Sequence, residues 1–276
     1  FSSLEEKLGG RFSDFAAAPL LYQPFGALSN ILSYEDVADH VETFPNPSLM
    51  MLSWYWVGDF EGNHPDYVPP NPTWGTTDDF VQMVADIKAQ GKLPMLFTLP
   101  IWWNENSREV TQLPPGSLDD IAVIDIEGNP SYSNWGPNWG YNVSLCSAYT
   151  INRIEQIFSD VFDTYSADVI YEDVVGARPP MLDFNANCTD QTMYGQNIIE
   201  HLDQHSDVTI VVEAGFDRLA ETVVGFMGTL LDKENTPPRS PFGPMDGWRP
   251  YPTAPMLYHD KIIPYPFWNS DPTAYE

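Results

Sequence analysis

Hydrophobic residues along this chain follow two patterns: short continuous apolar runs, and longer stretches in which apolar residues recur every three or four positions. Continuous runs are typical of strands buried on both faces, and the wider spacing is typical of helices with one apolar face. We expect strands at 49–56, 93–99, 169–174, 208–212 and 256–263. We expect helices at 76–91, 151–165, 193–202 and 216–231.

The alternation of strand and helix predicts an α/β fold in which helices cover a parallel sheet. A chain of 276 residues has the length of a TIM (β/α)8-type barrel, although only about five strand–helix units can be counted. We therefore expect a barrel that is incomplete or irregular. Residues 1–48 are punctuated by prolines and are expected to form an irregular leading segment packed on the barrel domain, which occupies residues 49–276.

Composition narrows the possible partners. With 39 acidic and 12 basic side chains, the chain has a formal net charge of −27. Nucleic acids and anionic membranes are bound through clustered Lys and Arg, so neither partner is expected. Hydrophobic residues, at 43%, suffice for a folded core, and Pro, Asp or Gly interrupts every apolar run before the roughly 20 residues that a membrane-spanning helix needs.

Two of the expected strands end in carboxylates. Asp173 closes the segment 169–173, and Glu213 closes the segment 209–213. If these strands are parallel neighbours, both acids lie at the carboxyl edge of the sheet, where α/β enzymes place their active sites. Adjacent strands lie about 5 Å apart, which matches the separation of the two carboxyls in a retaining glycosidase. Either acid alone would be interpreted as a solvated loop residue or a helix cap, so the pair is the stronger signal.

The sequence around both acids carries a recognisable set of motifs. The acids lie in 171–176 (YEDVVG) and 212–215 (VEAG), and further motifs are found at 64–69 (HPDYVP), 100–104 (PIWWN), 176–179 (GARP), 183–185 (DFN) and 258–260 (YHD). Together they resemble the catalytic core of endo-α-N-acetylgalactosaminidase-type glycoside hydrolases, and still more a related, largely uncharacterised fungal and bacterial branch. The resemblance runs from about residue 49 to residue 260.

This resemblance implies a (β/α)8-barrel catalytic domain that hydrolyses an α-linked glycan with retention of configuration. It also implies that Asp173 is the nucleophile and Glu213 the general acid/base. The motif of the family holds no carboxylate at the position of Glu172, so this residue is given no role.

Aromatic residues make up 14% of the chain and suggest how a sugar is held. Sugar rings stack their apolar faces on aromatic side chains, while polar side chains bind their hydroxyls. A Trp-rich core, a structural ion pair for Arg178 and a buried His259 are the alternative explanations. The candidate substrate-binding residues are Trp54, Trp56, Asp66, Trp102, Trp103, Asn104, Tyr171, Arg178, His259 and Asp260.

Cysteines and glycosylation motifs bear on the compartment. Cys146 and Cys188 either form one disulfide or remain two buried thiols. Sequons for N-glycosylation begin at Asn142 and Asn187. Together with the acidity, these features favour a secreted glycoprotein. A chain that begins at Phe1 fits either a cleaved leader or a piece of a longer protein.

Two other function classes remain open. A non-catalytic carbohydrate-binding pseudoenzyme would use the same aromatic residues. A metal-dependent hydrolase is suggested by His201 and His205, which have the spacing of the zinc-protease motif, but Glu200 precedes both histidines instead of lying between them. A solvated helix face is therefore the preferred interpretation of the two histidines. We expect no metal and no cofactor, and the expected partner is an oligosaccharide or glycoconjugate.

Overall fold

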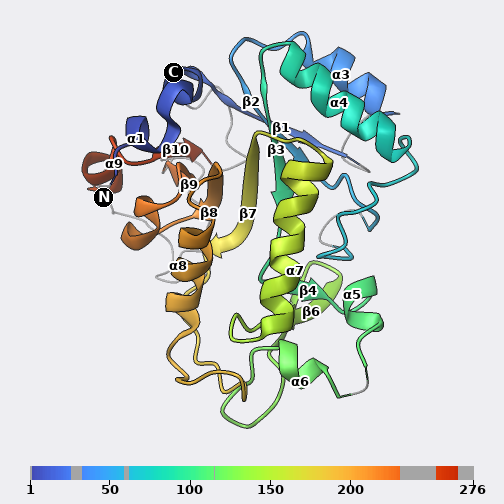
Figure 1. The fold of residues 1–276 in the computed structure, drawn as a ribbon, viewed down its shortest axis with the longest axis vertical. Helices are drawn as coiled ribbons and strands as arrows, with labels where there is room; N and C mark the ends of the chain where they lie inside the picture. Colours follow the sequence, from blue (N-terminus) through green and yellow to red (C-terminus); the bar gives the residue numbers. More distant parts are fainter. Residues whose placement is uncertain (1, 26–32, 59–61, 115, 231–252, 267–276) are drawn as a thin grey trace, which may run out of the picture.

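The computed structural model describes residues 2–25, 33–58, 62–114, 116–230 and 253–266. In this part of the chain, seven parallel strands form one sheet that is nearly closed into a barrel, with helices on its outside (Figure 1). The expected α/β barrel is thereby confirmed. In sheet order the strands are β1 (Leu20–Pro24), β2 (Leu49–Ser53), β3 (Leu93–Thr98), β7 (Val169–Gly176), β8 (Ile210–Ala214), β9 (Gly225–Leu230) and β10 (Ile263–Pro266).

The longer helices follow from their amphipathic sequences and their caps. Helix α4 begins after Thr76, whose side chain and that of Asp79 form a reciprocal capping box, and its buried residues recur with helical spacing. Helices α7 and α8 lie side by side over β7 (Figure 1). None of the described helices is long and apolar enough to cross a lipid bilayer. The four longer helices are α3 (Tyr34–Val41), α4 (Thr77–Ala89), α7 (Ala148–Ser159) and α8 (Tyr194–Gln204).

Shorter helical segments fill the connections. Helix α7 continues into a π-helical turn, and a 3-10 turn separates β8 from β9. The short segments are α1 (Leu4–Leu8), η1 (Gly9–Arg11), α2 (Phe12–Ala17), α5 (Arg108–Thr111), α6 (Leu118–Ile121), η3 (Asp160–Thr164), η4 (Asp217–Glu221) and α9 (Thr253–Tyr258).

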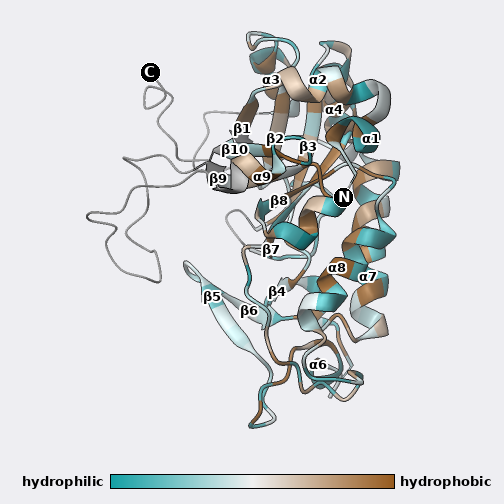
Figure 2. Ribbon diagram, turned by 90° about the vertical axis from the view of Figure 1, so that its left-hand side faces the viewer, coloured by the Kyte–Doolittle hydropathy of each residue, from teal (hydrophilic) through white to brown (hydrophobic). Residues whose placement is uncertain are grey.

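A second, antiparallel sheet is inserted between β3 and α7. Its strands are β4 (Trp102–Asn104), β5 (Tyr132–Trp135) and β6 (Asn138–Asn142), in the order β4-β6-β5. The β5–β6 hairpin stands clear of the barrel (Figure 2). Because β4 begins shortly after the carboxyl end of β3, this sheet lies beside the edge at which the chemistry is expected.

Three sequence-based expectations differ from the observed elements. The segment before residue 49 contains β1 as well as helices, since Leu20 pairs with Leu49 of β2. The apolar residues of 216–231 have helical spacing, but the segment forms η4 and then β9. Gly225 allows β9 and β10 to lie close together, because a Cβ there would lie 2.8 Å from the ring of Tyr265 on β10.

The expected strand at 256–263 is also different, because its first half belongs to α9 and β10 begins only at Ile263.

The amino ends of β9 and β10 are covered by α1. The Lys7 ammonium donates to the backbone oxygens of Ala220, Val223 and Lys261 at 2.6–2.8 Å. The start of the chain is thus fixed at the end of the barrel opposite to the strand-end acids.

Candidate active site

Asp173 on β7 and Glu213 on β8 lie on neighbouring parallel strands. Tyr171 pairs with Val211 in the ladder that joins the two strands. Paired residues point to the same face of a sheet, and so do residues two apart on one strand. Asp173 and Glu213, each two positions after the paired residues, therefore share a face. Glu172, which lies between Tyr171 and Asp173 and points to the opposite face, contacts His201 of the outer helix α8 at 3.0 Å, so the shared face is the barrel interior.

Each acid accepts a hydrogen bond, Asp173 from a residue of its own strand and Glu213 from the neighbouring strand. The Tyr171 hydroxyl donates to Asp173 Oδ1 at 3.0 Å, and both side chains are buried. The backbone N–H of Val174 donates to Glu213 Oε2 at 3.1 Å. This second bond links the carboxyl end of β7 to Glu213 on β8. The end of β7 therefore contributes to the position of both carboxylates.

The backbone bends sharply just after both acids. Val174 has φ 67° and Ala214 has φ 51°, values in the left-handed region that a β-branched residue rarely adopts. The β7–β8 ladder also shifts register between Glu172 and Gly176. Such conformations cost about 1–3 kcal/mol each and are concentrated at functional sites. Strained backbone in the same position on two adjacent strands marks this edge as the candidate active site.

Arg178 brings a positive charge to the acids. It follows β7 and donates through Nη1 to Oδ1 of Asn142 at the end of β6. Burial lowers the pKa of the guanidinium, whereas the nearby Tyr194, Asp173 and Glu213 act in the opposite direction. Arg178 therefore lies within electrostatic reach of both acids and connects them to the small antiparallel sheet.

Glu172 points away from this site. Its Oε1 lies 3.0 Å from Nε2 of His201 on α8, and the side chain is fully buried between strand and helix. Giving Glu172 no role at the acid pair agrees with this placement.

The expectation of a solvated face for the two histidines of α8 is wrong. His201 and His205 are both buried, because the helix packs them against β7 and α7. His205 stacks on Phe158 at 3.8 Å between ring centroids, and its Nε2 lies 3.0 Å from Oε1 of Glu155. Each histidine thus has a carboxylate partner in the packing layer outside the barrel.

The four tryptophans expected at the sugar site belong to the core. Trp54, Trp56, Trp102 and Trp103 are at most 4% exposed. Trp56 stacks on Phe97, and its indole N–H donates to the backbone oxygen of Gly62. The Trp-rich core that the composition left open accounts for these side chains, and their placement does not support a role as sugar platforms.

Two polar candidates instead hold loops in place. Asp66 Oδ2 accepts from the backbone N–H of Arg108 at the start of α5, and burial raises the pKa of this carboxyl. Asn104 is buried and accepts from the backbone N–H of Asn106. Both therefore shape the connections around β4.

His259 and Asp260 lie far from the acids along the barrel axis. They follow α9 and precede β10, which places them at the amino end of the sheet, where the Asp260 backbone oxygen accepts from the N–H of Leu4. Both side chains are exposed. Their position at the amino end separates them from the acids at the carboxyl end, so this geometry does not support substrate binding by His259 and Asp260.

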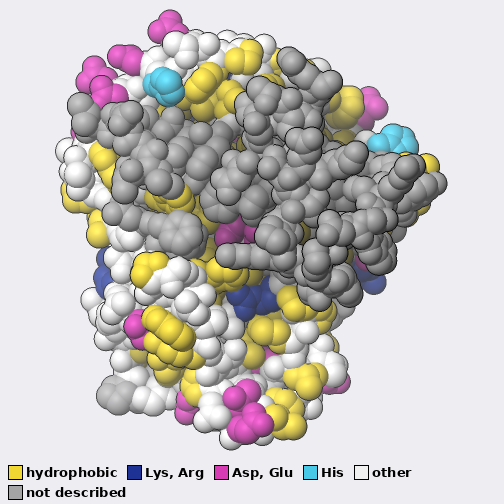
Figure 3. Space-filling model, turned by 180° about the vertical axis from the view of Figure 1, so that it is seen from behind, with side chains coloured by type: hydrophobic (Ala, Val, Ile, Leu, Met, Phe, Trp, Pro, Cys, Tyr) yellow, Lys and Arg dark blue, Asp and Glu magenta, His cyan; other side chains and the backbone are white. Residues whose placement is uncertain are grey.

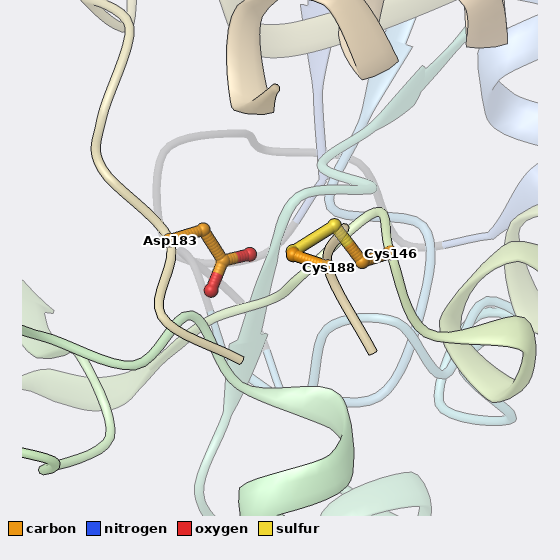
Figure 4. A group of neighbouring side chains, drawn as sticks. All are labelled: Cys146, Asp183 and Cys188. Carbon is orange, nitrogen blue, oxygen red and sulfur yellow. A yellow bond between two sulfur atoms is a disulfide. The ribbon is translucent and has the colours of Figure 1, made fainter. Parts of the chain in front are cut away.

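Cys146 and Cys188 form a disulfide across 42 residues. Asp183 lies beside it, and these three residues are the single group in the described part of the chain with the spacing of metal ligands (Figure 4). The two sulfurs are bonded to each other, so neither is a thiolate ligand. The group therefore does not fit a metal.

Sequence reasoning missed the structural role of Asn142. Its side chain is buried, accepts from Arg178 and donates to Ser131 Oγ at 2.8 Å. Because this amide nitrogen is buried and bonded to Ser131, the placement does not support a glycan at Asn142. Asn187 is exposed. Side chains of β6 alternate between its two faces, and this alternation turns Asn142 inward. It was the sequence signal that could have distinguished the sequon at Asn142 from the one at Asn187.

Comparison with known proteins gives structural matches alone, since no family model and no curated sequence matches this chain. The α-N-acetylgalactosaminidase NagBb of Bifidobacterium bifidum, in its GalNAc complex, aligns with a TM-score of 0.76 at 16% identity, over 95% of this chain and 44% of that protein. The α-galactosidase TtGalA of Thermus thermophilus, in complex with p-nitrophenyl α-D-galactopyranoside, aligns with a TM-score of 0.54 at 14% identity, over 82% and 44% of the two chains.

The trehalose-6-phosphate hydrolase TreA of Bacillus licheniformis gives a TM-score of 0.53 at 11% identity, over 78% of this chain and 50% of that one. Our chain thus spans half or less of the length of each of these proteins. All three are glycoside hydrolases with barrel domains, and the likeness at these identities establishes the barrel fold.

Proposed function

We propose that this protein is a retaining glycosidase that hydrolyses an α-linked glycan, with Asp173 as nucleophile and Glu213 as general acid and base. The observation that carries the proposal is the placement of the two acids on one interior face, at the carboxyl ends of adjacent parallel strands. Adjacent strands lie about 5 Å apart, which allows the two carboxyls to approach the separation of about 5 Å that a retaining enzyme needs.

The proposed reaction has two displacements. In the first, a carboxylate oxygen of Asp173 attacks the anomeric carbon while the bond to the leaving oxygen breaks and Glu213 gives that oxygen its proton. In the second, Glu213 takes a proton from water, whose oxygen attacks the anomeric carbon and releases Asp173. The Tyr171 hydroxyl orients the Asp173 carboxylate, and Arg178 stabilises negative charge at the site.

The sugar is proposed from the structural neighbours. An α-N-acetylgalactosaminidase and an α-galactosidase both share the barrel, and the second is bound to an aryl α-galactoside. We therefore propose an α-galactoside or N-acetyl-α-galactosaminide as the substrate class. A secreted protein is also proposed, because the disulfide between Cys146 and Cys188 needs an oxidising compartment to persist.

Turnover of p-nitrophenyl α-galactoside and p-nitrophenyl N-acetyl-α-galactosaminide by the wild type and by Asp173→Asn tests the assignment. We expect the variant to lose activity by roughly a thousandfold or more with its circular dichroism unchanged. Asp168→Asn is the matched control, because Asp168 precedes the same strand and forms a partly exposed ion pair with Lys88. Undiminished turnover by Asp173→Asn, or a β-anomer as first product in proton NMR, would contradict the proposal.

A further inference from the structure

The β5–β6 hairpin carries a row of aromatic rings on one face. The Tyr132 ring lies between two others, with centroids 5.1 Å from Trp139 and 5.0 Å from Tyr141. We call these three residues the hairpin strip. Tyr132 is 44% exposed and Trp139 is 43% exposed, whereas Trp56 and Trp102 have no exposure at all. Contiguous exposed apolar side chains, unlike single ones, are typical of interaction sites and ligand-binding grooves.

The strip is held rigidly. Tyr132 is paired with Tyr141 in an unbroken antiparallel ladder, and its hydroxyl donates to the Glu105 carboxylate after β4. That hydrogen bond raises the pKa of Tyr132 to about 12, so the phenol stays neutral at physiological pH. On the opposite face of β6, Gly140 lies against the indole of Trp102, where a Cβ would approach within 2.6 Å. The rings are therefore in place before any ligand arrives.

The hairpin also reaches the proposed active site. Asn142, which directly follows Tyr141, turns to the other face of β6 and accepts from Arg178, the cation near both acids. The strip and the contact that joins the hairpin to the catalytic edge therefore lie on opposite faces of β6, one residue apart along the strand. Figure 3 shows that hydrophobic side chains gather in separate patches on one face of the molecule, with acidic groups beside them.

We propose that the hairpin strip binds the leaving-group side of an oligosaccharide whose scissile bond lies at Asp173 and Glu213. This inference rests on the proposed function. Aromatic faces suit the C–H faces of sugar rings, and Glu105 and Asn134 beside the strip offer polar groups to hydroxyls. The net charge of −27 and the Glu105 carboxylate select a neutral glycan over an acidic one.

The chain offers a matched control. Tyr149 on α7 is likewise 45% exposed, and its hydroxyl likewise bonds to a glutamate, Glu109, but it lies outside the hairpin. Binding is measured by calorimetry in an Asp173→Asn background, so that the ligand stays intact. The probes are stachyose and an N-acetyl-α-galactosamine glycopeptide, each compared with the methyl α-glycoside of its terminal sugar.

We expect Trp139→Ala to weaken binding of the longer probe roughly fivefold to tenfold, with the methyl glycoside and the Tyr149→Ala variant unaffected. Equal affinity of Trp139→Ala and its parent for the longer probes, or the absence of binding by the parent, would overturn the inference. A change from dimer to monomer in Trp139→Ala, measured by light scattering, would also overturn it, because the strip would then join two copies.

The two proposals fail separately. Loss of turnover in Asp173→Asn together with unchanged oligosaccharide binding in Trp139→Ala removes the strip alone. Full turnover by Asp173→Asn removes the catalytic assignment, and a higher KM for stachyose in Trp139→Ala with Asp173 intact would still leave the strip as a glycan-binding surface.

Discussion

The backbone N–H of Val174 donates to Oε2 of Glu213. This bond crosses from β7 to β8 one residue after Asp173, at a position where Val174 has φ 67°. An extended residue would pair its N–H within the regular ladder, so the left-handed turn is what aims the N–H at the carboxylate. The strain in the backbone is thus connected directly to the orientation of the proposed acid/base.

Two substitutions at Glu213 separate this structural contact from catalysis. Glu213→Gln keeps an oxygen that accepts from Val174, so we expect the free energy of unfolding to change by less than about 0.5 kcal/mol while proton transfer is lost. Glu213→Leu leaves the Val174 N–H without that acceptor and should cost about 1–3 kcal/mol. Urea unfolding of both variants measures the difference. Equal stabilities would show that the Val174 contact contributes nothing.

Tyr171→Phe tests the contact on the nucleophile. The substitution removes a hydroxyl that donates to Asp173 Oδ1 at 3.0 Å and leaves a ring of nearly the same shape in the core. Hydrogen bonds to charged groups contribute about 1.5–3 kcal/mol, so we expect kcat to fall by roughly ten- to a hundredfold. The melting temperature controls for damage to the core. A kcat equal to that of the wild type would assign Tyr171 to packing alone.

Sequence alone predicts the barrel because its central strands are continuously apolar. The segments 49–52 and 210–212 contain only apolar residues, which is typical of strands buried on both faces. Strand β1 was missed because Pro19 and Pro24 bound a pair of leucines too short to show a pattern. Strand β9 was missed because Leu219, Val223 and Phe226 happen to keep helical spacing.

The sequence predicts only those site residues whose position follows from the order of the strands. Asp173 and Glu213 end adjacent strands, and their shared edge follows from the topology. The direction of a loop side chain does not follow in this way. Trp102 and Trp103 come just after a strand end, yet both belong to β4 of the small antiparallel sheet and are fully buried, Trp102 in the main core and Trp103 in a second apolar cluster. That sheet has long-range pairings that no local pattern shows.

Gly140→Ala tests how tightly the hairpin is attached to the barrel. An added Cβ would lie 2.3 Å from the Trp103 backbone oxygen and 2.6 Å from the Trp102 indole. Overpacking of this kind costs about 1–3 kcal/mol, so we expect a lower free energy of unfolding. Gly10→Ala is the control, because a Cβ there meets nothing within 4 Å. If both substitutions change the free energy of unfolding in urea equally, the hairpin can move away from Trp102 and Trp103 without cost.

The surroundings of His205 determine how the free energy of unfolding changes with pH. Burial lowers the pKa of the ring, and the nearby His201 lowers it further, while Glu155 and Glu172 act the other way. The unfolded chain therefore binds more protons than the folded protein just below the ordinary histidine pKa of about 6.5. Stability should decrease as the pH falls through 6.5 and level off below the folded pKa.

His205→Asn removes this titration, so the difference in melting temperature between pH 7.5 and pH 5.5 should be smaller than in the wild type. Glu155→Gln provides the opposite test, since it leaves the buried ring without the carboxylate that bonds to Nε2. Protonation of the ring is then harder in the folded state, and the acid-induced loss of stability should grow. If both variants keep the wild-type slope, the acid sensitivity arises from other groups and burial of His205 has no measurable part in it.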